Sequence, residues 1–230
     1  MKKKKMTVFM AVLSAAAIML TACGGGGKGG NGTKGAKDTL TVGLTANPIT
    51  LDPYNTTDSP ASKVNKNIHE TLLKYDDEMN IVPCLAESWE ITDDTTYIFK
   101  IRQGVKFHNG EELTAKDVKF SFDMQKDNPH AESVTGMVDF DNCKAVDDYT
   151  FELKLKKPFG SILQHLTQAV TSIVNEKTYT ENKENYGSKP VGTGPFKFKE
   201  WKKDDFVNLA KNDEYWGDKA KVKQLVFRII

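Results

Sequence analysis

The side chains that most often carry out chemistry in proteins occur in this sequence without the partners that such chemistry needs. The segment 69–73, His-Glu-Thr-Leu-Leu, begins like the zinc-binding helix of metalloproteases, but Leu73 stands where a second histidine must bind the metal. We expect this histidine to be an ordinary residue on a helix surface. His108 falls in a turn, and His130 and His165 have no neighbour at ligand spacing. The sequence therefore predicts no metal site.

A nucleotide-binding or nucleophilic site is not indicated either. The glycine run 24–32 is not a P-loop, because Ala22 takes the place of its first glycine. In addition, Gly29 follows Lys28 where Ser or Thr must hold magnesium. The sequence contains no Gly-x-Ser-x-Gly nucleophile elbow. We predict no catalytic residue, no cofactor and no enzymatic activity.

Cys23 is the residue with the clearest chemical role. Lys2 to Lys5 form a basic region, Met6 to Leu20 an apolar stretch, and small residues then lead to the cysteine, as in a secretory signal. The run 20–23, Leu-Thr-Ala-Cys, resembles the bacterial lipoprotein box. That resemblance implies a signal peptide over residues 1–22, cleavage before Cys23 and a diacylglycerol on its thiol. Two or more acyl chains hold a protein stably on a bilayer.

A transmembrane anchor is the alternative for this N-terminal segment, and its short length disfavours that interpretation. Residues 23–37 are rich in glycine and cannot bury a core, so we interpret them as a lipidated linker. The net charge of +1 becomes −3 once Lys2 to Lys5 are removed. A weakly acidic mature chain lacks the basic surface of a nucleic-acid binder, so no nucleic-acid partner is expected.

The two remaining cysteines, Cys84 and Cys143, leave a question open. An exported chain permits a disulfide between them, but the sequence does not show that they meet. Single cysteines more often behave as small buried apolar residues.

Hydrophobic periodicity predicts a mixed α/β domain that begins near residue 38. Alternation predicts strands over 40–44, within 81–107, over 151–155 and in three segments after residue 190. Spacings of three and four residues predict a helix over 60–74, one that starts at Thr114 with Asp117 in its first turn, and one that opens at Pro158. The apolar strand 222–230 has no cap or turn behind it, so we expect a truncated chain.

Three stretches resemble the family 5 extracellular solute-binding proteins in sequence, order and spacing. This family includes carriers of oligopeptides, dipeptides, nickel and glutathione. The first is Leu-Asp-Pro at 51–53 with the following helix. The second, which is the most specific, runs from Leu-Ala-Glu-Ser-Trp at 85–89 to Leu-Thr-Ala-Lys-Asp-Val at 113–118. The third is Gly-Thr-Gly-Pro-Phe at 192–196 with Asn-Asp-Glu-Tyr-Trp at 212–216.

This resemblance implies a fold of the type II periplasmic binding proteins, a clamshell of two lobes. The chain matches part of the first lobe, over residues 38–60 and 190–230, and a mixed α/β subdomain inserted into it, over residues 61–189. The second lobe has no counterpart in this sequence. We therefore expect an N-terminal part of such a protein.

The resemblance further implies an extracytoplasmic lipoprotein that captures peptides or similar small solutes for an ABC permease and its ATPase. Family peptide carriers bind their ligand as an added strand, and one such contact segment follows the Leu-Asp-Pro motif. It maps to Thr57, Asp58 and Ser59, which we predict as ligand contacts. These residues can equally form the N-cap loop of the following helix, served by Asp58 or Ser59, and both roles are compatible.

Two other functions remain open from the sequence. One is a truncated surface lipoprotein that has lost solute binding. The other is a secreted hydrolase, which the absence of a partnered nucleophile disfavours. The cargo itself is not indicated, because the residues that fix a peptide's terminal charges in this family lie in the second lobe.

Overall fold

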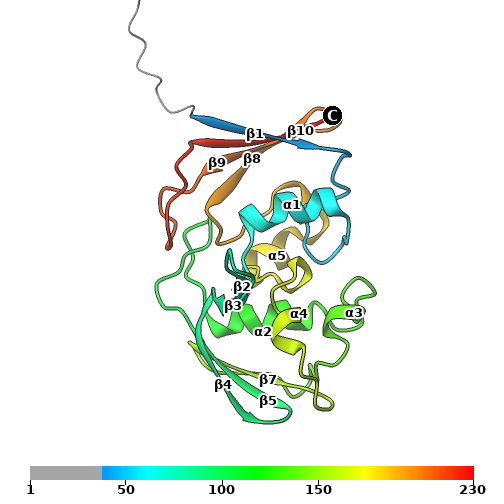
Figure 1. Cartoon of the computed structure of the whole chain (residues 1–230), viewed down its shortest axis with the longest axis vertical. Helices are drawn as coiled ribbons and strands as arrows, with labels where there is room; N and C mark the ends of the chain where they lie inside the picture. Colours follow the sequence, from blue (N-terminus) through cyan, green and yellow to red (C-terminus); the bar gives the residue numbers. More distant parts are fainter. Residues whose placement is uncertain (1–37) are drawn as a thin grey trace, which may run out of the picture. The chain divides into compact units, whose positions relative to one another are not determined.

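Two four-stranded sheets frame the part of the chain that the computed structural model describes, residues 38–230 (Figure 1). The predicted signal peptide 1–22, the lipidation site Cys23 and the linker 23–37 lie outside these residues. Within the described range, no helix has the length and apolar character needed to span a membrane.

The first sheet brings the beginning and the end of the described chain together. Its strand order is β1-β10-β9-β8, with β1 parallel to β10 and the other pairs antiparallel. Leu40 lies opposite Leu225 and Val42 opposite Phe227, so the apolar sides of β1 and β10 share one face. The strands predicted at the start and after residue 190 are confirmed; their bounds are Thr39–Leu44 (β1), Phe196–Lys202 (β8), Phe206–Lys211 (β9) and Gln224–Ile229 (β10).

The second sheet is antiparallel and comes from the middle of the chain. Its order is β4-β5-β7-β6, and a short hairpin of β2 and β3 precedes it. The strands are Ala86–Asp93 (β4), Thr96–Ile101 (β5), Lys144–Asp147 (β6) and Thr150–Lys154 (β7), and the hairpin strands are Leu73–Tyr75 (β2) and Ile81–Pro83 (β3).

Helices α1, α5 and α2 lie between the two sheets (Figure 1). The α-helices span Ser59–Ile68 (α1), Ala115–Asp123 (α2), Glu132–Thr135 (α3), Ile162–His165 (α4) and Glu176–Asn182 (α5), and 3₁₀ turns span Ala169–Thr171 (η1) and Lys183–Ser188 (η2). The predicted start of α2 is confirmed. The Thr114 N–H and hydroxyl both donate to Asp117 Oδ2 at 3.0 Å, which holds the first turn closed.

The three larger of four apolar cores among residues 38–230 hold these layers together. The core of the first sheet includes Val64 and Ile68 of α1 as well as Leu209 and Phe227. The larger core lies between the second sheet and α2, where Phe122 and its neighbours are fully buried. A small third core joins segments far apart in the chain, and it consists of Tyr54, Val174, Tyr179 and Tyr186.

Two helix predictions were wrong in length. The helix predicted over 60–74 ends at Ile68, because the chain beyond it pairs as strand: the Leu72 carbonyl accepts hydrogen bonds from Cys84 N–H and Ala86 N–H. The helix predicted from Pro158 is reduced to the single turn of α4 and the 3₁₀ turn η1. In the first of these segments, strand pairing overrides a helical spacing of apolar residues.

The proposed division into 38–60 with 190–230 and 61–189 stays a prediction. The described residues 38–230 all belong to one compact unit. Helix α1 begins at Ser59, and its buried residues Val64 and Ile68 share the core of the first sheet.

Candidate functional site

The loop that follows Leu-Asp-Pro is organised by the buried carboxylate of Asp52. Its Oδ1 accepts the Tyr54 N–H at 2.9 Å, and its Oδ2 accepts the Asn55 side-chain amide at 2.7 Å. The Tyr179 hydroxyl, which lies on α5, also donates to Oδ2 at 2.9 Å. The carboxylate therefore fixes both the turn of the loop and its position against α5.

Asp58 is the N-cap of α1. Its side chain accepts the Ala61 N–H, its backbone is extended (φ −69°, ψ 143°), and its second oxygen accepts the Ile49 N–H at 3.0 Å and the Thr56 hydroxyl at 2.8 Å. Ser59 does not cap the helix. Of the two residues proposed for the capping role, Asp58 is the one that fills it.

The backbone of Thr57 is left without a partner in the described part of the chain. Thr57 is exposed, and among residues 38–230 neither its N–H nor its carbonyl takes part in a hydrogen bond. The exposed Ser59 hydroxyl is likewise unpaired within that range. Free and exposed backbone groups are what an added strand needs, so this geometry is compatible with the predicted ligand contacts.

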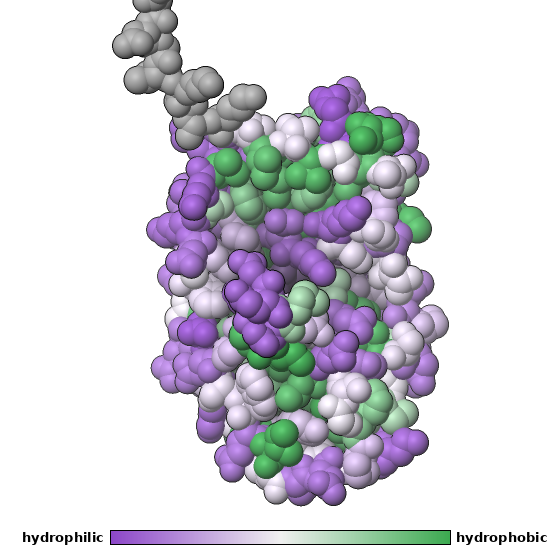
Figure 2. Space-filling view, viewed as in Figure 1, coloured by the Kyte–Doolittle hydropathy of each residue, from purple (hydrophilic) through white to green (hydrophobic). Residues whose placement is uncertain are grey.

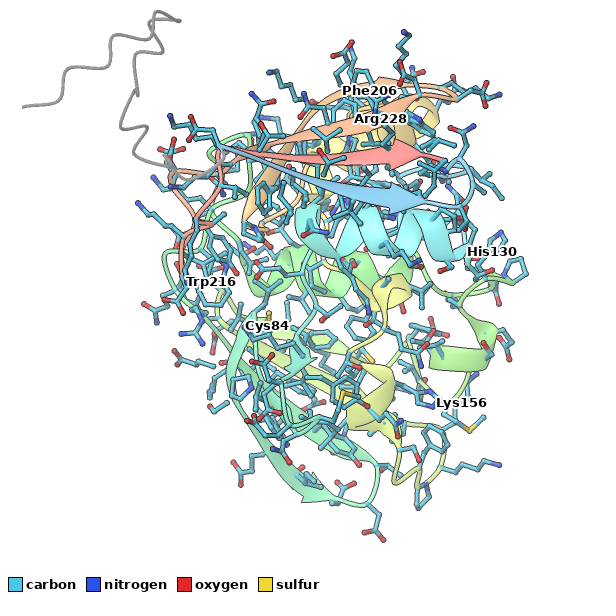
Figure 3. The ribbon with its side chains drawn as sticks, turned by 45° about the horizontal axis from the view of Figure 1, so that its top comes forward. Cys84, His130, Lys156, Phe206, Trp216 and Arg228 are labelled. Atoms are coloured by element: carbon cyan, nitrogen blue, oxygen red, sulfur yellow. The ribbon has the colours of Figure 1, made fainter. Side chains whose placement is uncertain are left out.

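Residues of two other chain segments hold this loop in place through hydrogen bonds to Tyr54. The Asn128 side-chain amide donates to the Tyr54 carbonyl at 2.8 Å, and the His130 N–H donates to Asn128 Oδ1 at 2.9 Å. The Tyr54 hydroxyl donates to the Ser172 carbonyl at 2.7 Å. Figure 3 shows His130 beside one end of α1. The sequence did not indicate the contacts of Tyr54 with Asn128 and Ser172, because they join residues that are 74 and 118 positions apart.

A cavity of about 330 Å³ lies at the other end of α1. Lys66, Lys74 and Ser172 are part of its lining, together with Glu70 and Tyr215. Figure 2 shows a recess with hydrophilic side chains near the middle of the face that is drawn there. The volume is at the lower end of the range for small-molecule pockets.

Glu70 lies directly after α1 and is a buried carboxylate with four donors. Its Oε1 accepts the Tyr215 hydroxyl at 2.7 Å and faces the Cys84 thiol at 3.7 Å. Its Oε2 accepts the Trp216 indole N–H and the Thr193 hydroxyl, both at 2.8 Å. Burial raises the pKa of Glu70, and these hydrogen bonds oppose that rise. With its lone pairs occupied, this carboxylate joins chain segments and is not available to a ligand.

The segment Gly192 to Pro195 packs against the end of α1, and its two glycine amides are bonded within the protein. The Gly194 N–H donates to the Ile68 carbonyl at 2.9 Å, and the Gly192 N–H donates to His108 Nδ1 at 3.3 Å. A Cβ on Gly192 would lie 2.0 Å from the Ile68 carbonyl oxygen. The glycines are therefore needed for close approach to the end of α1 and not for a left-handed backbone.

The expectation of a surface histidine at position 69 was wrong. His69 is 2% exposed, because the chain turns inward where α1 ends. Burial, with a further contribution from nearby His108, lowers the pKa of His69 to about 3. Burial also lowers the pKa of His108 to about 4. Both rings are therefore neutral at pH 7.

Cys84 and Cys143 are both free and buried. Burial raises the pKa of the Cys84 thiol to about 12 and that of the Cys143 thiol to about 11, which leaves both protonated and unreactive. The two behave as small apolar residues. Among residues 38–230 there is no group of three or more His, Cys, Asp or Glu residues arranged to hold a metal ion.

Comparison with known proteins gives this geometry a context. Residues 80–230 match the family model described as "Bacterial extracellular solute-binding proteins, family 5 Middle". The glutathione-binding protein of Pectobacterium atrosepticum is 35% identical over 187 residues, which cover 79% of this chain and 35% of that protein. The glutathione-binding protein of Escherichia coli K12 is 33% identical over 183 residues, which cover 79% of this chain and 36% of that protein. The chain thus spans little more than a third of the length of these curated relatives.

Solved structures show the same fold. The periplasmic binding protein DppA of Helicobacter pylori, in complex with the peptide STSA, superposes with a TM-score of 0.77 at 32% identity, covering 84% of this chain and 42% of that chain. The oligopeptide-binding protein AppA of Bacillus subtilis, in complex with a nonapeptide, gives a TM-score of 0.76 at 28% identity, covering 84% and 40%.

These relatives are solute-binding proteins and not enzymes, and their solved structures have the type II periplasmic-binding-protein fold. The expected resemblance and fold class are confirmed. The chain belongs to the bacterial extracellular solute-binding proteins, family 5.

Proposed function

We propose that this chain forms one wall of the solute site of an ABC importer's binding protein and receives a peptide or a similar small solute. The observation that carries the proposal is the unpaired backbone of Thr57, which is exposed in the loop before α1. A peptide that pairs with this loop as an added strand gains main-chain hydrogen bonds without displacing any that the described residues already make.

The relatives support a peptide-like cargo. Two of them are named for binding glutathione, a tripeptide, and two solved neighbours hold peptides of four and nine residues. In this proposal Thr57 contributes its backbone, and Ser59 contributes a free hydroxyl. Asp58 contributes indirectly, because its carboxylate caps α1 and fixes the loop.

We further propose that the protein is held outside the cell by lipid on Cys23 and delivers its solute to an ABC permease with its ATPase. The lipoprotein box and the preceding signal layout support the anchor. Fractionation of bacteria that express the full chain tests it. Cys23→Ala moves the protein from the membrane to the soluble fraction, whereas the control Cys143→Ala leaves it on the membrane. Membrane retention of the Cys23→Ala variant would contradict the anchor.

Isothermal titration of the full chain with the peptide Ser-Thr-Ser-Ala and with glutathione tests the solute site. We expect binding of at least one of them and a loss of about tenfold in affinity for an analogue with an N-methylated central amide, because a main-chain bond is removed. Ser59→Ala weakens binding, whereas Ser88→Ala, an exposed serine on β4, does not.

The competing function is a surface lipoprotein without solute binding. If the protein has this function, neither solute gives a heat of binding in the titration. Equal affinity for the peptide and its N-methylated analogue would instead show that the solute does not pair with the loop backbone.

A further inference from the structure

Arg102 directly follows β5 and is held rigidly. Its Nε donates to the Cys84 carbonyl at 3.3 Å, and its guanidinium carbon lies 4.7 Å from the centre of the Trp216 ring. The Trp216 ring is itself fixed, because its N–H donates to Glu70. A stacked and hydrogen-bonded guanidinium has lost most of its rotamer freedom before any ligand arrives.

The outer edge of this guanidinium is free. In the described part of the chain, its two terminal nitrogens make no hydrogen bond and no ion pair. Lys74, Arg102 and Trp216 line one cavity. The side chain of Lys74 is also without an ion-pair partner among residues 38–230. Lysines elsewhere on the surface, such as Lys177 and Lys223, do pair with carboxylates.

The nearby acidic groups do not neutralise these two cations. The Glu70 carboxylate is taken up by four donors, although the positive charge of Lys74 acts on it. Asp218 is exposed and forms no ion pair within 4 Å among the described residues. The cavity therefore carries an excess of positive charge.

The cavity has a volume of about 570 Å³ and is lined by Lys74, Arg102, Tyr215, Trp216, Asp218 and three smaller residues. We propose that it is an oxyanion site, which takes the carboxylate or phosphate group of a small molecule. The planar edge of Arg102 binds two oxygens of the group side by side, and Lys74 adds a point charge.

This site is distinct from the solute-receiving loop. None of its lining residues belongs to the segment 57–59. Figure 3 places Trp216 and Cys84 on one side of the molecule and His130, which neighbours that loop, on the opposite side. The two proposals can therefore fail independently.

Titration of the full chain with inorganic phosphate and, separately, with acetate at fixed ionic strength tests the proposal. Chloride replaces the oxyanion in the control titration. We expect millimolar binding that quenches tryptophan fluorescence, because Trp216 forms part of the wall. Binding of phosphate alone points to a phosphate ester as the natural ligand, and binding of acetate points to a carboxylate.

Three variants then locate the binding. Arg102→Lys weakens it about tenfold, because the two-pronged contact is lost while the charge remains. Lys74→Gln weakens it several-fold and leaves the stack of Arg102 on Trp216 intact. Lys63→Gln, which changes an exposed and unpaired lysine of α1, leaves the affinity unchanged.

If Arg102→Lys does not fold, Lys74→Gln alone decides the question. The proposal is overturned if neither oxyanion binds more strongly than chloride, or if Lys74→Gln and Lys63→Gln have equal effects. In that case the stack of Arg102 on Trp216 serves only to hold Trp216 in place.

Discussion

The Tyr179 hydroxyl donates a hydrogen bond to Oδ2 of Asp52 across 127 positions of sequence. Both groups are buried, and the Tyr179 ring packs against Tyr54 and Tyr186 with centroid distances of 5.6 and 4.6 Å. The contact ties α5 to the loop that leads into α1. Burial, and then the negative charge of Asp52, raises the pKa of Tyr179, so the phenol stays protonated and remains a donor at physiological pH.

Tyr179→Phe therefore lowers the free energy of unfolding by about 1.5–3 kcal/mol, the range for a hydrogen bond to a charged group. Urea denaturation measures the change. Tyr149→Phe is the matched control, since the Tyr149 hydroxyl donates to Glu112 at 2.7 Å on the surface, and it leaves stability nearly unchanged. Equal losses in the two variants would show that burial of the Asp52 contact adds nothing.

Gly192→Ala destabilises the protein because the position has no room for a methyl group. The added Cβ would lie 2.0 Å from the Ile68 carbonyl oxygen and 2.8 Å from His69 Nδ1, so the backbone must move away from the end of α1. We expect a loss of about 1–3 kcal/mol in the free energy of unfolding, as for other overpacked positions. Thermal denaturation checks this, with Gly160→Ala as the control, because nothing lies within 4 Å of a Cβ there. A loss in both variants would point to a general effect of replacing glycine.

Much of the fold follows from period-two alternation in the sequence. The strands β5, β7 and β10 are long enough to show it, and in them buried residues recur at alternate positions. In β1 the alternation predicts the strand, although only Leu44 is buried and Leu40 is exposed. The motif with Thr114 and Asp117 predicts the start of α2 correctly, since a capping box is a local interaction.

The sequence fails where long-range contacts decide the local structure. Leu72 continues the spacing of Val64 and Ile68, yet it lies beyond the helix. Its carbonyl instead accepts hydrogen bonds from Cys84, just after β3, and from Ala86, the first residue of β4. No local pattern distinguishes it from a further turn of helix.

Buried polar contacts are the other part that sequence reasoning missed. Glu70 gathers Thr193, Tyr215 and Trp216 from more than 120 positions away, and such a cluster has no sequence spacing. The family motifs contain these residues but do not reveal that they meet. The sequence also leaves the choice between Asp58 and Ser59 as the cap open, because both residue types cap helices well.

Asp58→Ala lowers the free energy of unfolding by about 1–2 kcal/mol, because it removes the cap of α1 and the contacts to Ile49 and Thr56. The neighbouring Ser59→Ala has little effect on stability, since no hydrogen bond of the Ser59 hydroxyl is found among residues 38–230. Urea denaturation of both variants separates capping from ligand contact. A stable Asp58→Ala variant together with an unstable Ser59→Ala variant would reverse the capping assignment.

The buried histidines make stability depend on pH. The ordinary pKa of 6.5 falls to about 3 for His69 and about 4 for His108 in the folded protein. Below pH 6.5 the unfolded chain therefore binds protons that the folded chain does not. The contribution of these histidines to the free energy of unfolding is greatest above pH 6.5 and decreases as the pH falls.

Each such histidine contributes up to about 1.4 kcal/mol per pH unit to this slope. Between pH 6.5 and 5, His69→Leu therefore makes the decrease in unfolding free energy shallower by up to that amount, whatever its effect at pH 7. His130→Leu, at an exposed site, serves as the control. Urea denaturation at a series of pH values measures both slopes. An unchanged slope in His69→Leu would mean that this ring takes up its proton in the folded state, which would require access to solvent that its 2% exposure denies.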